Sequence, residues 1–271
     1  MIPMYYLIIL AIVQGITEFL PISSSAHLVI LPYAMGEADQ GLLIDVAVHV
    51  GTLFAVMLYF HKDILSIANA FTLKLTDKSD DYSFYRKLGI LVILASLPVI
   101  LAGFALHSFL PEGIRDIRII AATTLIFGLM LWWADRRAQN LDLKKITFKS
   151  ALIIGFAQIF ALLPGTSRSG VTMTAAMALG FSRAEAARFS LLLGIPAILG
   201  AGTLGAIDLI KQGDNLLQID ALIAAALSFI TAYVSILVMM RWLKSSTFTP
   251  FVIYRMILGI VLLFIITMMP T

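Results

Sequence analysis

The sequence contains no cysteine and few charged residues. The absence of cysteine excludes disulfides, thiolate zinc sites and cysteine nucleophiles. Charged residues make up 13% of the chain, whereas soluble domains usually carry about 25%. Any chemistry must therefore come from Ser, His, Glu, Asp or Arg, or from a cation held by oxygen and imidazole ligands.

Apolar residues are abundant instead. They make up 60% of the 271 residues, and the mean hydropathy is +0.97. A spanning helix needs about 20 apolar residues, so the chain has room for roughly six to ten. We therefore predict an all-α, polytopic integral membrane protein without a separate soluble catalytic domain. The net charge of +3 does not indicate nucleic-acid binding, because the basic residues fall in short loops, where they orient a membrane protein.

Most apolar runs are long enough to cross a membrane, but two are too short. Residues 1–20 lack a basic leader and a small-residue cleavage site, so we expect a retained helix. Runs 26–35 and 171–180 would each cover about 15 Å as helices, half of a hydrocarbon core of about 30 Å. Each of the two follows a break that contains proline and serine. The remaining runs are 42–60, 88–109, 117–134, 149–163, 186–210, 219–243 and 251–269.

Five matched residue pairs, about 144 positions apart, indicate an internal repeat with halves 1–143 and 144–271. Three full crossings between the two breaks make the second half enter the membrane from the opposite face. We therefore predict one membrane domain of two inverted-topology repeats, each with a re-entrant helix pair and three full transmembrane helices. The matched pairs are Gln14 with Gln158, Pro21 with Pro164, Ser24 with Ser167, Gly36 with Gly180, and Gly51 with Gly194.

The distribution of basic residues predicts the orientation of the chain. Four segments, 61–87, 135–149, 181–188 and 241–250, carry 14 of the 19 Lys and Arg residues. Basic loops remain on the inner side of a membrane. Both termini are therefore expected on the outer side.

The first break carries polar side chains that are costly inside a membrane. Gln14 and Glu18 are four residues apart and would share one helix face. Ser23–Ser25 stand where the next helix starts, the preferred place for N-caps, and His27 lies in its first turn. Glu18 and His27 are suited to acid, base or metal-ligand chemistry. The alternative is that the serines only cap the helix, His27 is packed, and Glu18 pairs with a basic residue.

The second break, Pro164–Thr172, has the composition of an anion site. A turn containing Gly165 opens a short helix, whose free N–H groups and dipole favour negative charge. Arg168 adds the side chain best shaped to hold phosphate oxygens. A capped helix with Arg168 snorkelling to a headgroup is the alternative. One shared site requires both hairpin tips to lie near the middle of the membrane.

Two weaker signals lie outside the breaks. Asp45 and His49 are four residues apart, and we consider a proton relay and a buried hydrogen-bonded pair about equally. Arg255 follows Tyr254 near the start of the last apolar run, where we favour an interfacial anchor over a role in the site.

The two motifs resemble those of a known family. The runs Gln14-Gly-Ile-Thr-Glu18-Phe-Leu-Pro21-Ile-Ser-Ser24-Ser-Ala-His27 and Pro164-Gly-Thr-Ser167-Arg168-Ser169-Gly-Val-Thr172 are similar to those of the bacterial undecaprenyl-diphosphate phosphatases, also called bacitracin-resistance proteins, BacA or UppP. The resemblance implies a plasma-membrane enzyme that removes one phosphate from undecaprenyl diphosphate and so recycles a lipid carrier of peptidoglycan synthesis. It also implies dependence on a divalent cation, Mg²⁺ or Ca²⁺, a site open to the periplasm, a fold of inverted repeats with re-entrant helices, and often a homodimer. In such a membrane, the outer side on which the basic loops place both termini is the periplasmic side.

The resemblance also assigns roles to single residues. It implies that Glu18 is the key carboxylate and possible cation ligand, Ser24 the nucleophile, His27 an acid, base or metal-assisting group, and Arg168 the diphosphate clamp. Because Gln14 stands at a position that can be Glu in the family, Glu18 is the only acid of its motif. A cation bridging Glu18 and the diphosphate is therefore favoured over a cage of protein ligands. The expected substrate-binding residues are Gln14, Ser23, Ser25, Gly165, Ser167, Ser169 and Thr172.

Two alternatives remain open at this point. Ser24 either forms a phospho-enzyme or positions a water molecule. A lipid-phosphate flippase or secondary transporter is the rival function, because inverted repeats with broken helices also build transporters.

Overall fold

The computed structural model describes residues 2–72, 80–109, 114, 116–137, 140–212 and 215–268. The described residues are almost entirely helical, with one isolated bridge between Leu141 and Phe181. The helices are α1 (Met4–Thr17), α2 (Ser24–Met35), α3 (Gly41–Tyr59), α4 (His61–Thr72), α5 (Asp80–Phe109), α6 (Ile117–Asp135), η1 (Leu143–Lys145), α7 (Phe148–Ala157), η2 (Gln158–Leu162), α8 (Arg168–Ala178), α9 (Arg183–Gln212), α10 (Asn215–Trp242) and α11 (Thr249–Met268).

Several of these helices are long and apolar enough to cross a membrane. Among the described residues four qualify, in α5, α6, α10 and α11, and a fifth is added if α3 and α4 are counted as one bent span. The chain is therefore a multi-pass, all-α membrane protein, as predicted. Residues 186–210, which we expected to form a full crossing, lie in α9; because the side chains of 201 and 204–210 are outside the described ones, that crossing stays a prediction.

Helix α4 is a difference from the prediction, which placed residues 61–87 in a basic loop. The chain bends by 75° between α3 and α4, so α4 turns away from the line of α3. An ion pair ties α4 to α9: the Arg188 guanidinium donates to both carboxylate oxygens of Asp63, at 2.5 and 3.2 Å. These two residues are 125 positions apart, so the local sequence carried no signal for this contact.

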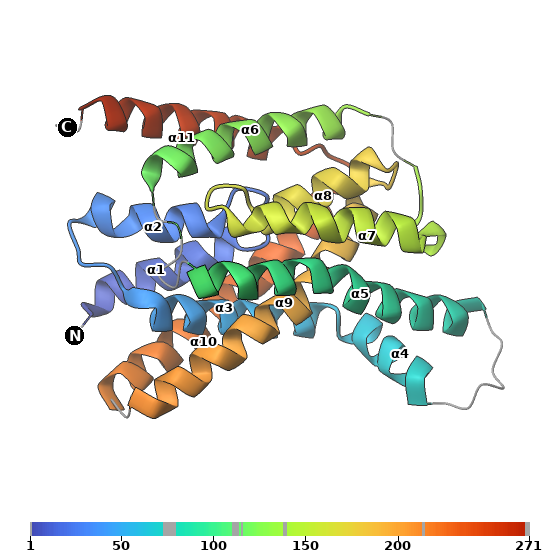
Figure 1. Cartoon of the computed structure of the whole chain (residues 1–271), viewed down its shortest axis with the longest axis horizontal. Helices are drawn as coiled ribbons and strands as arrows, with labels where there is room; N and C mark the ends of the chain where they lie inside the picture. The colour runs from blue at the N-terminus through green and yellow to red at the C-terminus, as the bar shows by residue number, and fades with distance from the viewer. Residues whose placement is uncertain are drawn as a thin grey trace.

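Two short hairpins approach each other in the middle of the molecule (Figure 1). Helices α1 and α2 run in from the end where the chain begins and return to it, while α7 with η2 and α8 run in from the opposite end. The lengths of α2 and α8, 12 and 11 residues, agree with the two short apolar runs of the sequence. The closed ends of both hairpins carry the two polar motifs.

The two hairpins turn in the same way. Ser23 and Ser167 are the N-caps of α2 and α8, and both have a positive φ, +74° and +69°. Each hydroxyl accepts a hydrogen bond from the backbone N–H three residues on, the usual N-cap contact. The conformational partner of Ser167 is thus Ser23, not Ser24, so the pairing of Ser24 with Ser167 was wrong by one residue.

Small residues allow the helices around the hairpins to pack closely. Helix α1 packs against α10, α7 against α5, α6 against α11, and α3 against both α9 and α10. Gly51 of α3 lies directly on the α10 backbone, where an added Cβ would overlap the carbonyl oxygen of Ala225. Beside it, the Ser228 hydroxyl donates to the Val48 carbonyl oxygen at 2.8 Å. Close approach of α3 and α10 therefore depends on glycine at this position.

Gly51→Ala should destabilise the protein by about 1–3 kcal/mol, because an extra methyl group in a filled interface forces the backbones apart. Thermal unfolding in detergent measures the change. Gly200→Ala in α9 is the matched control, since a Cβ there meets no atom within 4 Å. Equal melting temperatures for the two variants would contradict the packing described here.

Candidate functional site

The Glu18 carboxylate is the centre of a polar cluster where the two hairpins meet. It follows the last residue of α1, and its side chain is only 5% exposed. One oxygen, Oε1, accepts a hydrogen bond from Arg168 Nη2 at 2.8 Å. The other, Oε2, accepts from Ser24 Oγ at 2.6 Å and from Gln14 Nε2 at 3.0 Å. The sequence prediction that these four residues form one site is thus consistent with their positions.

Ser24 owes its position to the cap before it. It is the first residue of α2, directly after Ser23, so its hydroxyl faces back toward Glu18 while Ser23 occupies the cap. Ser25 contacts only the Ser23 hydroxyl, at 3.2 Å, among the hydrogen bonds of the described residues. A serine hydroxyl that donates to a buried carboxylate has a base ready to take its proton.

Arg168 uses only part of its guanidinium within the protein. Nη2 pairs with Glu18, but Nη1 is buried and has no hydrogen-bond partner in the described part of the chain. The group lies against Gly194 of α9, where a Cβ would overlap it. Snorkelling to a headgroup, the alternative considered above, is therefore wrong: Arg168 faces inward and keeps one donor for an anion.

The other hydroxyls of the second hairpin hold it in place. Ser169 donates to the Leu20 carbonyl oxygen at 3.1 Å and so joins the two hairpins. Thr172 bonds the Arg168 carbonyl at 2.9 Å and contacts the Ser190 hydroxyl at 2.6 Å. Gly165 has a φ of +87°, and a Cβ there would overlap the α6 backbone. Their predicted contacts with substrate stay predictions.

His27 lies in the first hairpin, like Glu18 and Ser24, but its side chain contacts Tyr254 and not Glu18. Its Nδ1 is 2.7 Å from the Ser23 carbonyl oxygen, and its Nε2 is 2.5 Å from the Tyr254 hydroxyl of α11. The two rings stack with centroids 5.7 Å apart. Within the described residues no hydrogen bond links His27 to Glu18 or Arg168. Tyr254 was missed as a site residue because 227 positions separate it from His27.

Arg255 is a buried clamp, and the prediction of an interfacial anchor was wrong. Its side chain is 0% exposed and is surrounded by backbone carbonyls. It makes no ion pair with a carboxylate in the described residues. The five accepting carbonyls belong to both hairpin turns and to α6: Pro21 at 3.1 Å, Gly165 at 2.9 Å, Thr166 at 3.0 Å, Thr124 at 3.2 Å and Thr123 at 3.5 Å.

His49 and Asp45 are hydrogen-bonded to each other, one of the two alternatives considered above, but through the Asp45 backbone; a proton relay stays a prediction. His49 Nδ1 lies 2.6 Å from the backbone carbonyl oxygen of Asp45, not from its carboxylate. The Asp45 carboxylate instead accepts from Gln40 at 2.6 Å. The other ring nitrogen of His49, Nε2, lies 3.4 Å from Glu18 Oε2. His49 therefore belongs to the Glu18 cluster.

The donor set around Glu18 fits a divalent cation shared with a substrate. The described residues hold no group of three His, Cys, Asp or Glu side chains placed to bind a metal, so a cage of such ligands is absent there. Oxygen donors are nevertheless present: Glu18 Oε2, and Gln14 Oε1, which is buried without a hydrogen-bond partner. Hard cations such as Mg²⁺ and Ca²⁺ prefer such oxygens and accept phosphate oxygens as further ligands.

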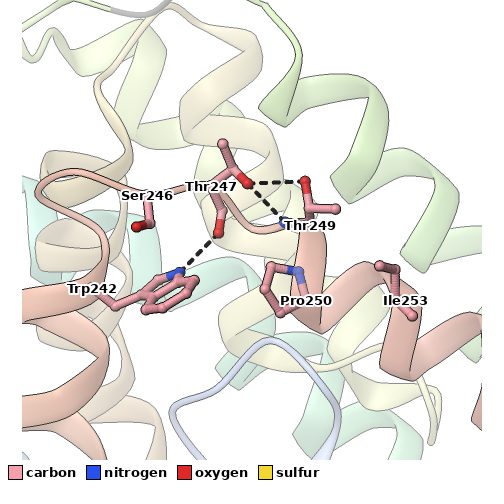
Figure 2. Close-up of a pocket in the computed structure, with 6 residues that line it drawn as sticks. All are labelled: Trp242, Ser246, Thr247, Thr249, Pro250 and Ile253. Atoms are coloured by element: carbon pink, nitrogen blue, oxygen red, sulfur yellow. Dashed lines mark hydrogen bonds between the residues drawn. The ribbon is translucent and has the colours of Figure 1, made fainter.

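The polar cluster does not coincide with a surface pocket beside α11. A pocket of about 610 Å³ lies where the chain enters α11 (Figure 2). It is lined by Trp242, Ser246, Thr247, Thr249, Pro250 and Ile253, and Thr247 links its walls by accepting from Trp242 Nε1 at 3.0 Å. None of the Glu18 cluster lines it, so we place the chemistry at the hairpins.

Comparison with known proteins agrees with the motifs. A family model described as bacitracin resistance protein BacA matches residues 7–261. The chain belongs to this family. A relative from Ruegeria pomeroyi, named undecaprenyl-diphosphatase, is 47% identical over 262 residues, 96% of this chain and 97% of the relative. Relatives of the same name from Alteromonas mediterranea and Maricaulis maris are 46% and 48% identical, with 97% and 95% of this chain and 98% and 97% of the relative covered.

Arg255→Met should lower the free energy of unfolding by about 3 kcal/mol or more, because it removes the charged donor of five carbonyls in both hairpin turns and α6. Arg255→Lys should restore only part of the loss, since a compact ammonium group cannot reach all of them. Thermal unfolding in detergent is the measurement. Arg241→Met, at the exposed end of α10, should change little; an equal effect of the two methionine variants would show that Arg255 is not a clamp.

Proposed function

We propose that the protein is an undecaprenyl-diphosphatase: it hydrolyses undecaprenyl diphosphate to undecaprenyl phosphate and inorganic phosphate. The observation that carries this proposal is the contact of Glu18 with both Ser24 and Arg168, in a chain whose full-length relatives bear that name. The product is the lipid carrier reused in peptidoglycan synthesis. Bacitracin resistance fits the name of the family.

In the proposed reaction, Ser24 Oγ attacks the terminal phosphorus as Glu18 Oε2, 2.6 Å away, takes the hydroxyl proton. The bond from that phosphorus to the bridging oxygen breaks, and undecaprenyl phosphate leaves. A water molecule then releases phosphate from Ser24. In the alternative scheme the same carboxylate activates water directly, and Ser24 orients it.

Positive groups stabilise the charge on the phosphate oxygens during either scheme. Arg168 Nη1 is the free donor, and the N-termini of α2 and α8 add the positive ends of two helix dipoles. His27 and Tyr254, hydrogen-bonded at 2.5 Å, are placed to relay a proton at the edge of this site. Glu18 would hold a divalent cation such as Mg²⁺ or Ca²⁺, which would supply positive charge against the phosphate oxygens.

The membrane arrangement that we propose is two inverted repeats, 1–143 and 144–271, each with a re-entrant hairpin. Several observations support it. The two hairpins enter from opposite ends of the molecule (Figure 1), and their caps share one unusual conformation. In these repeats α1 corresponds to α7, and α5 corresponds to α10. The packing of α1 against α10 therefore has its counterpart in the packing of α7 against α5.

The proposed location is the bacterial plasma membrane, with both termini on the periplasmic side. In Figure 1, α1 begins and α11 ends at one end of the molecule, and the basic segment between α6 and α7 lies at the other. A homodimer stays a prediction that rests on the family resemblance alone.

Ser24→Ala should reduce phosphate release from undecaprenyl diphosphate by about 10³-fold, because it removes the nucleophile or the group that orients the water. Ser108→Ala is the control: the same change at an exposed hydroxyl of α5, whose hydrogen bond goes to the Phe104 carbonyl oxygen. Phosphate release by purified protein with Mg²⁺ or Ca²⁺ is measured. Similar rates for the two variants would exclude Ser24 from the reaction, and capture of labelled phosphate on Ser24 would distinguish the phospho-enzyme from the activated water.

Arg168→Ala should abolish cation-dependent phosphate release while the protein still inserts into membranes. The same preparations in liposomes test the rival function. Movement of the lipid between leaflets by the wild type, with no phosphate produced, would favour a flippase or transporter over the hydrolase.

A further inference from the structure

His49 belongs to the Glu18 cluster, but the proposed reaction gives it no role. It comes from α3, a helix outside both hairpins, and its side chain is 30% exposed. Its Nε2 lies 3.4 Å from Glu18 Oε2, the carboxylate oxygen that also receives Ser24 and Gln14. The proposed function therefore places His49 within reach of any group bound at that oxygen.

The backbone fixes which nitrogen of His49 faces Glu18. Nδ1 lies 2.6 Å from the Asp45 carbonyl oxygen. A carbonyl oxygen can only accept a hydrogen bond, so Nδ1 must be the donor. In the neutral ring Nδ1 then carries the hydrogen, and the Nε2 lone pair points toward Glu18. Histidines that bind metals are oriented in this way, by an N–H to carbonyl contact on the far side of the ring.

The separation of the two donors suits one shared ion. Two ligands that each lie about 2.1 Å from an ion, at an angle of roughly 90–110°, are about 3.0–3.4 Å apart. The distance from His49 Nε2 to Glu18 Oε2 falls in that interval. Gln14 contacts the same carboxylate oxygen through its Nε2 at 3.0 Å, and its own Oε1 is buried with no hydrogen-bond partner among the described residues.

We propose that His49 Nε2 is a direct ligand of the divalent cation, together with Glu18 Oε2, and that Gln14 Oε1 completes the protein's share of the site. This inference rests on the proposed function, because the remaining ligands are the oxygens of the diphosphate. It gives the site a mixed nitrogen and oxygen donor set. Such a set favours Mn²⁺ over Ca²⁺, since imidazole binds transition metals better than hard alkaline-earth ions.

Binding of Mn²⁺ to the purified protein tests the proposal without any turnover. Methylenediphosphonate, which is not hydrolysed, is added to supply the phosphate ligands. Electron spin echo envelope modulation spectroscopy of the bound Mn²⁺ should detect a coordinated ¹⁴N nucleus in the wild type and no coordinated ¹⁴N in the His49→Gln variant. The affinity for Mn²⁺ should fall about tenfold or more in His49→Gln and His49→Ala, whereas the affinity of His49→Gln for Ca²⁺ should change far less.

His61→Gln is the matched control, because His61 makes the same kind of contact, from Nδ1 to the Leu58 carbonyl at 2.8 Å, but is exposed at the start of α4. It should bind Mn²⁺ as the wild type does. Absence of bound Mn²⁺, absence of ¹⁴N modulation in the wild type, or its persistence in His49→Gln would each overturn the proposal. Phosphate release from undecaprenyl diphosphate with Ca²⁺ is measured on the same wild-type sample. If one of these results is obtained but phosphate is released, only the role of His49 fails. If no phosphate is released, the proposed function itself fails.

Discussion

Backbone groups set free where a helix is interrupted inside a membrane need partners within the protein, because lipid supplies none. Arg255 meets that need for both hairpins at once. Its donors reach the Pro21 carbonyl in the first turn and the Gly165 and Thr166 carbonyls in the second. A buried charge is costly unless it is fully hydrogen-bonded, and five carbonyls achieve this without a carboxylate. Arg255, together with the Ser169 contact to the Leu20 carbonyl, thus holds the two turns, and hence Glu18 and Arg168, beside each other.

Glu18 and Arg168 are also largely buried charged groups that need partners within the protein. Each partner compensates the charge of the other while no substrate is bound, which reduces the cost of burying both charges. Arg168 nevertheless keeps Nη1 without a hydrogen-bond partner among the described residues, and the Ser24 hydroxyl remains on the opposite carboxylate oxygen. A diphosphate that binds Nη1 adds negative charge beside a carboxylate, which favours a cation between them. The His49 contact places an additional donor at that position.

Local sequence predicted the parts that depend on local physics. The proline and serine breaks predicted the turns, short apolar runs predicted α2 and α8, and the spacing of Gln14 and Glu18 predicted their shared face. Local sequence did not predict the contacts between residues that lie far apart in the chain. Arg255 and its Pro21 partner are 234 positions apart, and His27 and Tyr254 are 227 apart. A Tyr-Arg pair at the start of an apolar helix has the same local pattern in an interfacial anchor as in a clamp.

Because Ser23, and not Ser24, is the N-cap that matches Ser167, the alignment of the two hairpins moves by one residue. With the caps aligned, Ser24 corresponds to Arg168, and Ser25 to Ser169. The first residue of each short helix therefore reaches Glu18, one with a hydroxyl and the other with a guanidinium. The scaffold is alike in both turns, since each needs a cap in the left-handed region. The side chain differs at the next position, so in the proposed reaction one turn supplies the hydroxyl that attacks or orients water, and the other supplies the charge that binds the phosphate.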